Sequence, residues 1–321
     1  MLGITRTTVA RALNETGNIK EETREKILKL ANELGYEKNY LGSSLAKKSK
    51  KIIAAFLVRS LNEEYSERIK KGLKAVEKEV KAYGFKLEIY ETNIDEPEEQ
   101  LKILKEVLTR DLEGIIIIPL EIEEIRKILF SYYDKLKIIS IGEKIFEETY
   151  NINSEYYKSG RIAGELMGSL VEESGKLLVF DGGDDKVSSK KYLNGFCDRI
   201  EELDKKYIGP LYIENMLENK EKILEFVTND IKYLYLNRYA PEIVEYLKEQ
   251  NVGNFKIIIN GMSKKIRNLV FNGDVVATVS ENLYDQGYTA GKVMFEMIYK
   301  PGLNKSQSYN SKVDIFIKEN I

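Results

Sequence analysis

The chain has 321 residues, of which 43% are apolar, so it is long enough for two or three domains with buried cores. It contains no histidine and a single cysteine, which excludes Ser-His-Asp and Cys-His catalysis, most zinc sites and an internal disulfide. We therefore expect no metal and no cofactor, and an enzyme is the minority interpretation.

The sequence also indicates where the protein works. A single cysteine fits a reducing compartment. No run of 18 apolar residues is present that could span a membrane. Arg6 and Arg11 interrupt any apolar signal-peptide core near the N-terminus. We expect a cytoplasmic protein with no membrane partner.

The net charge of −2 hides an uneven distribution. Residues 1–51 contain 11 Lys and Arg against 6 Asp and Glu, whereas the remaining residues contain 39 basic and 46 acidic side chains. A basic segment on an acidic body indicates that only the N-terminal segment approaches a polyanion.

Residues 3–14 predict a tight turn followed by a short helix. Gly3 suits the turn because glycine adopts positive φ readily. The Thr5 hydroxyl can cap the helix, and Val9, Ala12 and Leu13 then share one face. The opposite face offers guanidinium and small polar groups, which suit the DNA major groove, although a solvated polar face is an equal alternative. The candidate DNA-contacting residues here are Thr5, Arg6, Thr7, Thr8, Arg11 and Asn14.

A second helix is predicted over residues 21–34, with Ile27, Leu28, Ala31 and Leu34 as its buried stripe. The segments TVARALN, EETREKIL and ELGYEKN follow one another in residues 8–39. Together they resemble the DNA-binding head of the LacI/GalR (lactose/galactose-repressor) family. The resemblance implies a helix-turn-helix head and, with lower specificity, extends through the rest of the chain.

The resemblance has two further consequences for the head. Family members carry about a dozen residues before the position of Gly3, and these form a first helix. We expect either a misassigned start or a truncated head, which in-frame DNA upstream of the Met1 codon would distinguish. Residues 39–51 correspond to the hinge, and Leu45 matches the family leucine that wedges into the minor groove. An ordinary linker leucine is the alternative.

From residue 51 onward, strand and helix patterns alternate, which predicts an α/β fold with doubly wound parallel sheets. The predicted strands are 52–58, 86–92, 114–120, 136–142, 176–182, 207–213, 232–237, 255–260, 275–281 and 311–317. The predicted helices are 69–83, 100–112, 122–133, 156–171, 188–202, 219–229, 240–250, 263–272 and 284–299.

The resemblance refines this pattern into a fold class. That class is a small all-α helix-turn-helix head, truncated here, on an α/β type I periplasmic-binding-protein-like core of two doubly wound parallel-sheet lobes. The expected divisions are 1–38 for the head, 39–51 for the hinge, 52–153 with 283–311 for the N-terminal lobe, and 154–282 with 312–321 for the C-terminal lobe.

The resemblance also implies an effector site between the lobes. Its candidate residues are Ser60, Asn62, Tyr65, Tyr192, Asn237 and Asn260. A structural loop role is the alternative for each of them. Sugar-binding relatives carry arginine at the position of Tyr192 and aspartate at that of Asn260. Because both charge-assisted contacts are lost, we expect a largely neutral ligand: a sugar or glycoside first, a nucleoside second.

The resulting hypothesis is a transcriptional regulator, most simply a repressor. It would bind palindromic operator DNA as a homodimer and respond to a small effector bound between its lobes. One alternative is a cytoplasmic ligand-binding protein that has lost DNA binding through its truncated head. Another is a structural or interaction protein with an empty cleft.

Overall fold

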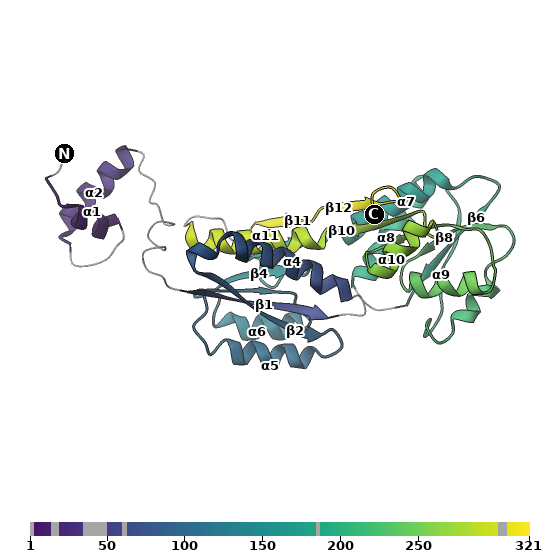
Figure 1. Cartoon of the computed structure of the whole chain (residues 1–321), viewed down its shortest axis with the longest axis horizontal. Helices are drawn as coiled ribbons and strands as arrows, with labels where there is room; N and C mark the ends of the chain where they lie inside the picture. The colour runs from purple at the N-terminus through teal and green to yellow at the C-terminus, as the bar shows by residue number, and fades with distance from the viewer. Residues whose placement is uncertain (1–2, 14–18, 35–49, 60–62, 184–186, 301–306) are drawn as a thin grey trace. The chain divides into compact units, whose positions relative to one another are not determined.

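The computed structural model describes residues 3–13, 19–34, 50–59, 63–183, 187–300 and 307–321 (Figure 1). The chain divides into a compact head within residues 1–49 and a larger core that contains nearly all of residues 50–321.

The head contains the helices α1 (Arg6–Leu13) and α2 (Glu21–Glu33), which pack on each other. Gly3 has φ +60°, and the Thr5 hydroxyl accepts the Thr8 N–H at 3.2 Å, so both features predicted for the start of α1 are confirmed. Ala12 and Ile27 are buried, at 1% and 3% exposed.

The predicted buried stripe of α2 is partly wrong. Leu28 is 42% exposed and Leu34 is 74% exposed. The physical reason is geometric, because the short helix α1 covers only a narrow strip of α2 around Ile27. Leu34 also lies in a turn beyond the last helical residue.

One lobe of the core is built on a parallel sheet in the order β11-β5-β4-β3-β1-β2. Its strands are β1 (Lys51–Arg59), β2 (Phe85–Asn93), β3 (Gly114–Ile117), β4 (Lys137–Ile141), β5 (Tyr150–Asn153) and β11 (Ser308–Asn310). Its helical segments are α4 (Glu63–Glu79), η1 (Lys81–Tyr83), α5 (Pro97–Val107), α6 (Ile122–Phe130) and α11 (Leu283–Tyr299). The helix α11 enters from late in the chain and packs along α4.

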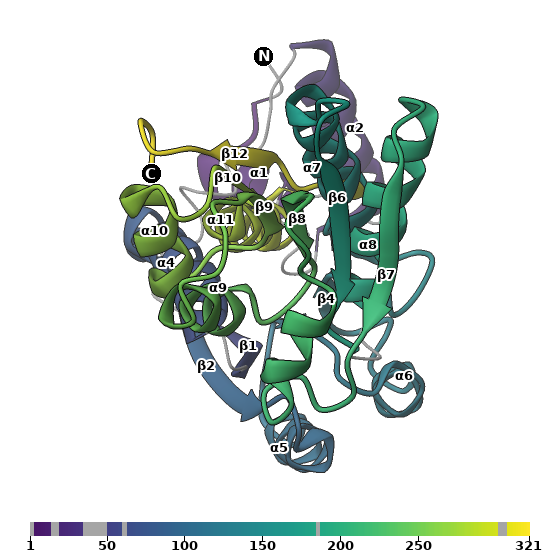
Figure 2. The same ribbon diagram turned by 90° about the vertical axis from the view of Figure 1, so that its right-hand side faces the viewer.

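The other lobe has a sheet in the order β12-β10-β9-β8-β6-β7, in which only β12 is antiparallel. Figure 2 shows β9, β8, β6 and β7 side by side in this order. The strands are β6 (Lys176–Asp181), β7 (Tyr207–Tyr212), β8 (Ile231–Leu236), β9 (Lys256–Asn260), β10 (Ala277–Glu281) and β12 (Val313–Phe316). The helical segments are α7 (Tyr156–Leu170), α8 (Val187–Glu202), η2 (Lys220–Glu225), α9 (Ala240–Glu249) and α10 (Lys264–Asn272).

The predicted fold class is confirmed by these two doubly wound lobes. The chain passes between the sheets three times, after β5, after β10 and after β11. Among the described residues, no helix combines the length and apolar character needed to cross a membrane.

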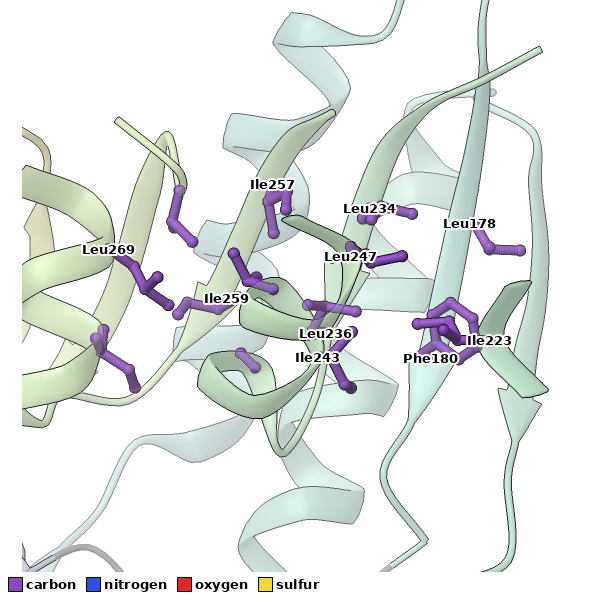
Figure 3. Packing of buried hydrophobic residues seen from close by; sticks show 14 of the residues in the cluster. Leu178, Phe180, Ile223, Leu234, Leu236, Ile243, Leu247, Ile257, Ile259 and Leu269 are labelled. Atoms are coloured by element: carbon purple, nitrogen blue, oxygen red, sulfur yellow. The ribbon is translucent and has the colours of Figure 1, made fainter. Parts of the chain in front are cut away.

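Alternating side chains fill both faces of the second sheet. Leu178 and Phe180 of β6 pack with α9, α10 and η2 (Figure 3). Leu177 and Val179 pack instead with α7 and α8. Because successive strand side chains point to opposite faces, a strand buried on both sides needs an uninterrupted apolar run, and LLVF provides it.

Several predicted boundaries differ from the structure. The helix predicted at residue 100 begins at Pro97, a favoured first helical residue because proline lacks the N–H that would be unpaired there. The helix predicted over 219–229 is the short 3₁₀ segment η2. The strands β5 and β11 were not predicted, since YNIN and SYN contain no apolar run.

Candidate functional site

The candidate DNA-contacting face of α1 is open to solvent. Thr5, Arg6, Thr7 and Arg11 are exposed, and Thr8 is half-buried, where its hydroxyl pairs with that of Thr5 at 2.9 Å. Asn14 and Leu45 lie outside the described residues. The DNA-binding roles of all these residues therefore stay predictions.

A pocket opens at the carboxyl ends of β4 and β5, where ligands bind in doubly wound folds. Its volume is about 280 Å³, and its walls are Gly142, Glu143, Lys144, Asn151, Asn153, Ser154, Glu155, Tyr156 and Lys191. Lys191 comes from α8, so both lobes contribute to the pocket. Its ammonium lies 3.5 Å from the Glu143 carboxylate.

Tyr156 in the wall of this pocket contacts two further tyrosines, Tyr65 and Tyr192. The ring of Tyr156 packs edge-on against that of Tyr192, with centroids 5.3 Å apart. Tyr65 of α4 is hydrogen-bonded to the Tyr156 hydroxyl, and burial raises the pKa of Tyr156 to about 12. Tyr65 and Tyr192, which the sequence assigned to one site, are thus brought together through Tyr156.

The Tyr192 hydroxyl donates to Glu281 Oε2 at 2.5 Å. Glu281 ends β10 and is 5% exposed. Its other oxygen, Oε1, has no hydrogen-bond partner among the described residues. Burial raises the pKa of the Glu281 carboxyl, against the opposing effects of the Tyr192 hydroxyl, the Glu281 backbone and the Ser159 hydroxyl.

Glycines explain how α7 and α8 bring these groups together. A Cβ atom on Gly160 of α7 would lie 2.1 Å from the Tyr192 carbonyl oxygen. A Cβ atom on Gly195 of α8 would lie 2.1 Å from the Tyr157 carbonyl oxygen. Only glycine permits this approach, because any side chain would collide with the facing backbone.

Asn237 follows β8, is 3% exposed and lies beside the start of α8. Its amide nitrogen donates to the Ser189 carbonyl oxygen at 3.1 Å and weakly to Asp181 Oδ1 at 3.5 Å. Asn237 Oδ1 and Ser189 Oγ are buried and have no partners among the described residues. Such unpaired atoms are costly unless a ligand or water satisfies them.

The Asn260 side chain forms hydrogen bonds within its own lobe. Its Oδ1 accepts the Tyr235 hydroxyl at 2.6 Å, and its Nδ2 donates to Ser159 Oγ at 2.9 Å and to the Val279 carbonyl at 3.2 Å. A ligand contact by Asn260 would therefore compete with these bonds, and its role stays a prediction. Ser60 and Asn62 lie outside the described residues.

Sequence reasoning did not single out Glu281 or Ser189. Glu281 is the last residue of a predicted strand, and Ser189 lies in the first turn of a predicted helix. Both lie at the carboxyl edge of one sheet, so reading every strand end as a candidate ligand contact would have found Glu281.

The buried carboxyl predicts a pH effect that a Glu281→Gln substitution should remove. Because burial raises the folded-state pKa of this acid, the folded form retains a proton that the unfolded form releases above about pH 4.3. As the pH rises from about 4.3 to the raised pKa, the free energy of unfolding of the wild type should therefore decrease relative to that of the variant. Thermal unfolding should show similar melting temperatures at pH 4 and a higher value for the variant at pH 8, by roughly 2–4 °C per kcal/mol. A variant that melts lower at pH 8 would contradict this.

Comparison with known proteins is consistent with this architecture. Residues 53–301 match the periplasmic binding protein domain, and residues 2–39 match the bacterial regulatory proteins of the lacI family. Catabolite control protein A of Staphylococcus xylosus is 24% identical over 192 residues, covering 60% of this chain and 56% of that protein. The chain thus spans about half the length of the curated relatives it matches.

Two solved structures share the fold. A protein from Bacteroides fragilis described as a LacI transcriptional regulator has a TM-score of 0.70 at 16% identity, covering 85% of this chain and 98% of that chain. A glucose-galactose binding protein from Geobacillus stearothermophilus has a TM-score of 0.69 at 19% identity, covering 85% and 99%. At these identities the likeness concerns the fold alone.

Proposed function

Because the chain belongs to the LacI family of bacterial regulatory proteins and its core to the periplasmic-binding-protein domain family, we propose that it is an effector-controlled transcriptional regulator. One observation carries the proposal. The chain combines a head whose helix exposes Arg and Thr side chains with a two-lobed core. Buried polar atoms at the strand ends of this core have no hydrogen-bond partner among the described residues.

The mechanism we propose is repression by a homodimer on a palindromic operator. Two heads would place two α1 helices in successive major grooves, about one helical turn apart. Effector binding would favour one arrangement of the two lobes and thereby change the affinity for DNA. The protein would act in the cytoplasm, where its DNA is, and by binding without catalysis.

The effector we propose is a small sugar-like molecule held between the lobes. The solved structure from Geobacillus stearothermophilus is that of a sugar-binding protein with the same fold. In this chain, Asn237 Oδ1 and Ser189 Oγ are unsatisfied acceptors of the kind that sugar hydroxyls pair with.

Selection of bound duplexes from a random DNA library tests the regulator proposal. The purified full chain should enrich one palindromic sequence, and sedimentation should give a dimer on that duplex. Failure to enrich any sequence, together with tight binding of a small ligand, would instead favour a ligand-binding protein without a DNA partner.

Replacing Asn237 by alanine should weaken effector binding about tenfold or more. The loss of one buried hydrogen bond costs about 1–3 kcal/mol, and about 1.4 kcal/mol corresponds to a tenfold change in affinity. Calorimetric titration against sugars, sugar phosphates and nucleosides measures this. Asn272→Ala, at an exposed asparagine in α10, is the control and should bind as wild type does. If the panel's only ligand were a multiply charged phosphate held through Lys190 or Lys191, this interpretation of the pocket would be wrong.

A further inference from the structure

Glu281 is a buried carboxyl group without a cation. It is 5% exposed, its Oε2 accepts the Tyr192 hydroxyl, and its Oε1 has no hydrogen-bond partner among the described residues. No ion pair within the described part of the chain includes Glu281, and the nearby carboxylate of Glu155 repels its charge and raises its pKa. A buried carboxylate normally needs a paired cation, because desolvation of an isolated charge is costly.

Four tyrosines from different elements interact electrostatically with this carboxyl group, and one of them, Tyr192, is hydrogen-bonded to it. They are Tyr65 of α4, Tyr156 of α7, Tyr192 of α8 and Tyr235 of β8. Burial, and in addition the charge of Glu281, raises the pKa of each of these phenols, so all four lie within electrostatic range of the carboxyl group. Aromatic rings around a carboxylate are the arrangement with which proteins bind ammonium groups, because ring faces attract cations.

Tyr156 connects this cluster to the pocket. It forms part of the pocket wall, and its ring packs on that of Tyr192, whose hydroxyl holds Glu281. Tyr156 is therefore in contact both with the pocket and with the residue whose hydroxyl binds Glu281. The same wall carries Glu143 and Glu155, and the Glu143 carboxylate is already paired with Lys191.

We propose that Glu281, Tyr65, Tyr156 and Tyr192 form a subsite for a protonated amine of the effector, so that the ligand is an amino sugar and not a neutral sugar. This inference rests on the proposed function, since it names the ligand class of the same site. The ammonium group donates to the unsatisfied Glu281 Oε1 and packs against the tyrosine rings. The hydroxyl groups of the sugar pair with Asn237 Oδ1 and Ser189 Oγ. Tyr192 thereby orients the charge that recognises the ligand.

Calorimetric titration of the full chain at pH 7 tests the subsite with matched probes. D-glucosamine and D-galactosamine carry the amine, whereas D-glucose, D-galactose and N-acetyl-D-glucosamine do not. We expect at least one amino sugar to bind ten times more tightly than its neutral counterparts. Glu281→Gln should remove this preference, because the amide keeps an acceptor for Tyr192 and lacks the charge.

Two further measurements separate the possible failures. Tyr192→Phe, which leaves the carboxylate in place, should retain most of the preference for the amine, and circular dichroism should show that both variants are folded. Equal binding of neutral and amino sugars, or a preference that survives in Glu281→Gln, would overturn the amine subsite and leave the regulator proposal intact. Absence of binding by every probe would overturn both the subsite and the sugar-like effector. Absence of any selected DNA sequence would count against the regulator proposal alone.

Discussion

Replacement of Gly160 by valine is expected to destabilise the core by about 3 kcal/mol, near the upper end of overpacking effects. The Cβ atom would lie 2.1 Å from the Tyr192 carbonyl oxygen, 2.9 Å from its carbon and 3.0 Å from the Phe196 nitrogen. All three atoms belong to the backbone of α8, which has no rotamer by which to move away. The helices α7 and α8 must therefore separate, which opens the apolar contact between them.

Equilibrium unfolding in urea, followed by circular dichroism, measures this loss as a lower midpoint at similar slope. Gly168→Ala in the same helix is the matched control. Its Cβ atom would meet Leu203 Cδ1 at 2.4 Å, and this flexible side-chain end can rotate aside. Since alanine gains about 1 kcal/mol of helix propensity over glycine, the control should be neutral or slightly more stable. Equal midpoints for Gly160→Val and wild type would refute the close packing of α7 and α8.

Gly160→Val should also weaken effector binding. The helix α8 carries Ser189 and Tyr192, whose positions relative to Asn237 and Glu281 depend on its contact with α7. A displaced α8 changes these distances although no contact residue has been replaced.

Replacement of Arg6 by alanine is the second large effect that we expect. Arg6 is exposed at the first helical position of α1, on the face assigned to the major groove. An arginine that reads a base edge contributes about 1–3 kcal/mol, so operator affinity should fall roughly 5- to 150-fold. The base preference at one position of each half-site should also relax.

Competition binding with single-base operator variants, after selection of the operator, measures both changes. Lys29→Ala removes an exposed cation from α2, outside the assigned face, and is the control. It should leave the base preference unchanged and alter at most the salt dependence. A uniform loss of affinity across all bases in Arg6→Ala would assign Arg6 to the phosphates instead.

For Leu45, which lies outside the described residues, we expect a different effect on DNA binding. If its side chain wedges between base steps, Leu45→Ala should weaken operator binding by a few kcal/mol with little change in the salt slope, because no phosphate contact is lost. Fluorescence anisotropy over a range of salt concentrations separates the two quantities. Unchanged operator affinity would reject the wedge and favour an ordinary linker leucine.

The sequence by itself determined the alternation of strands and helices, and the family resemblance supplied the two-lobed arrangement. Apolar runs such as IIAAFLV in β1 and LLVF in β6 favour strands covered on both faces, and apolar residues at helical spacing indicated the covering helices. Local chemistry likewise determined the start of α1, where Gly3 makes the turn and Thr5 makes the cap. These features depend on neighbours within a few positions, so the order of residues is enough to predict them.

Only the tertiary structure decided the composition of the candidate site. Tyr192 and Glu281 are 89 positions apart and meet because β10 and α8 lie in one lobe. The glycines that permit the close packing of α7 and α8 read in sequence only as weak points in two helices, and β5 and β11 form because each pairs with a neighbouring strand. The physical reason is that a buried carboxyl group, a backbone contact and an edge strand are each defined by a partner, and that partner is adjacent only in the folded chain.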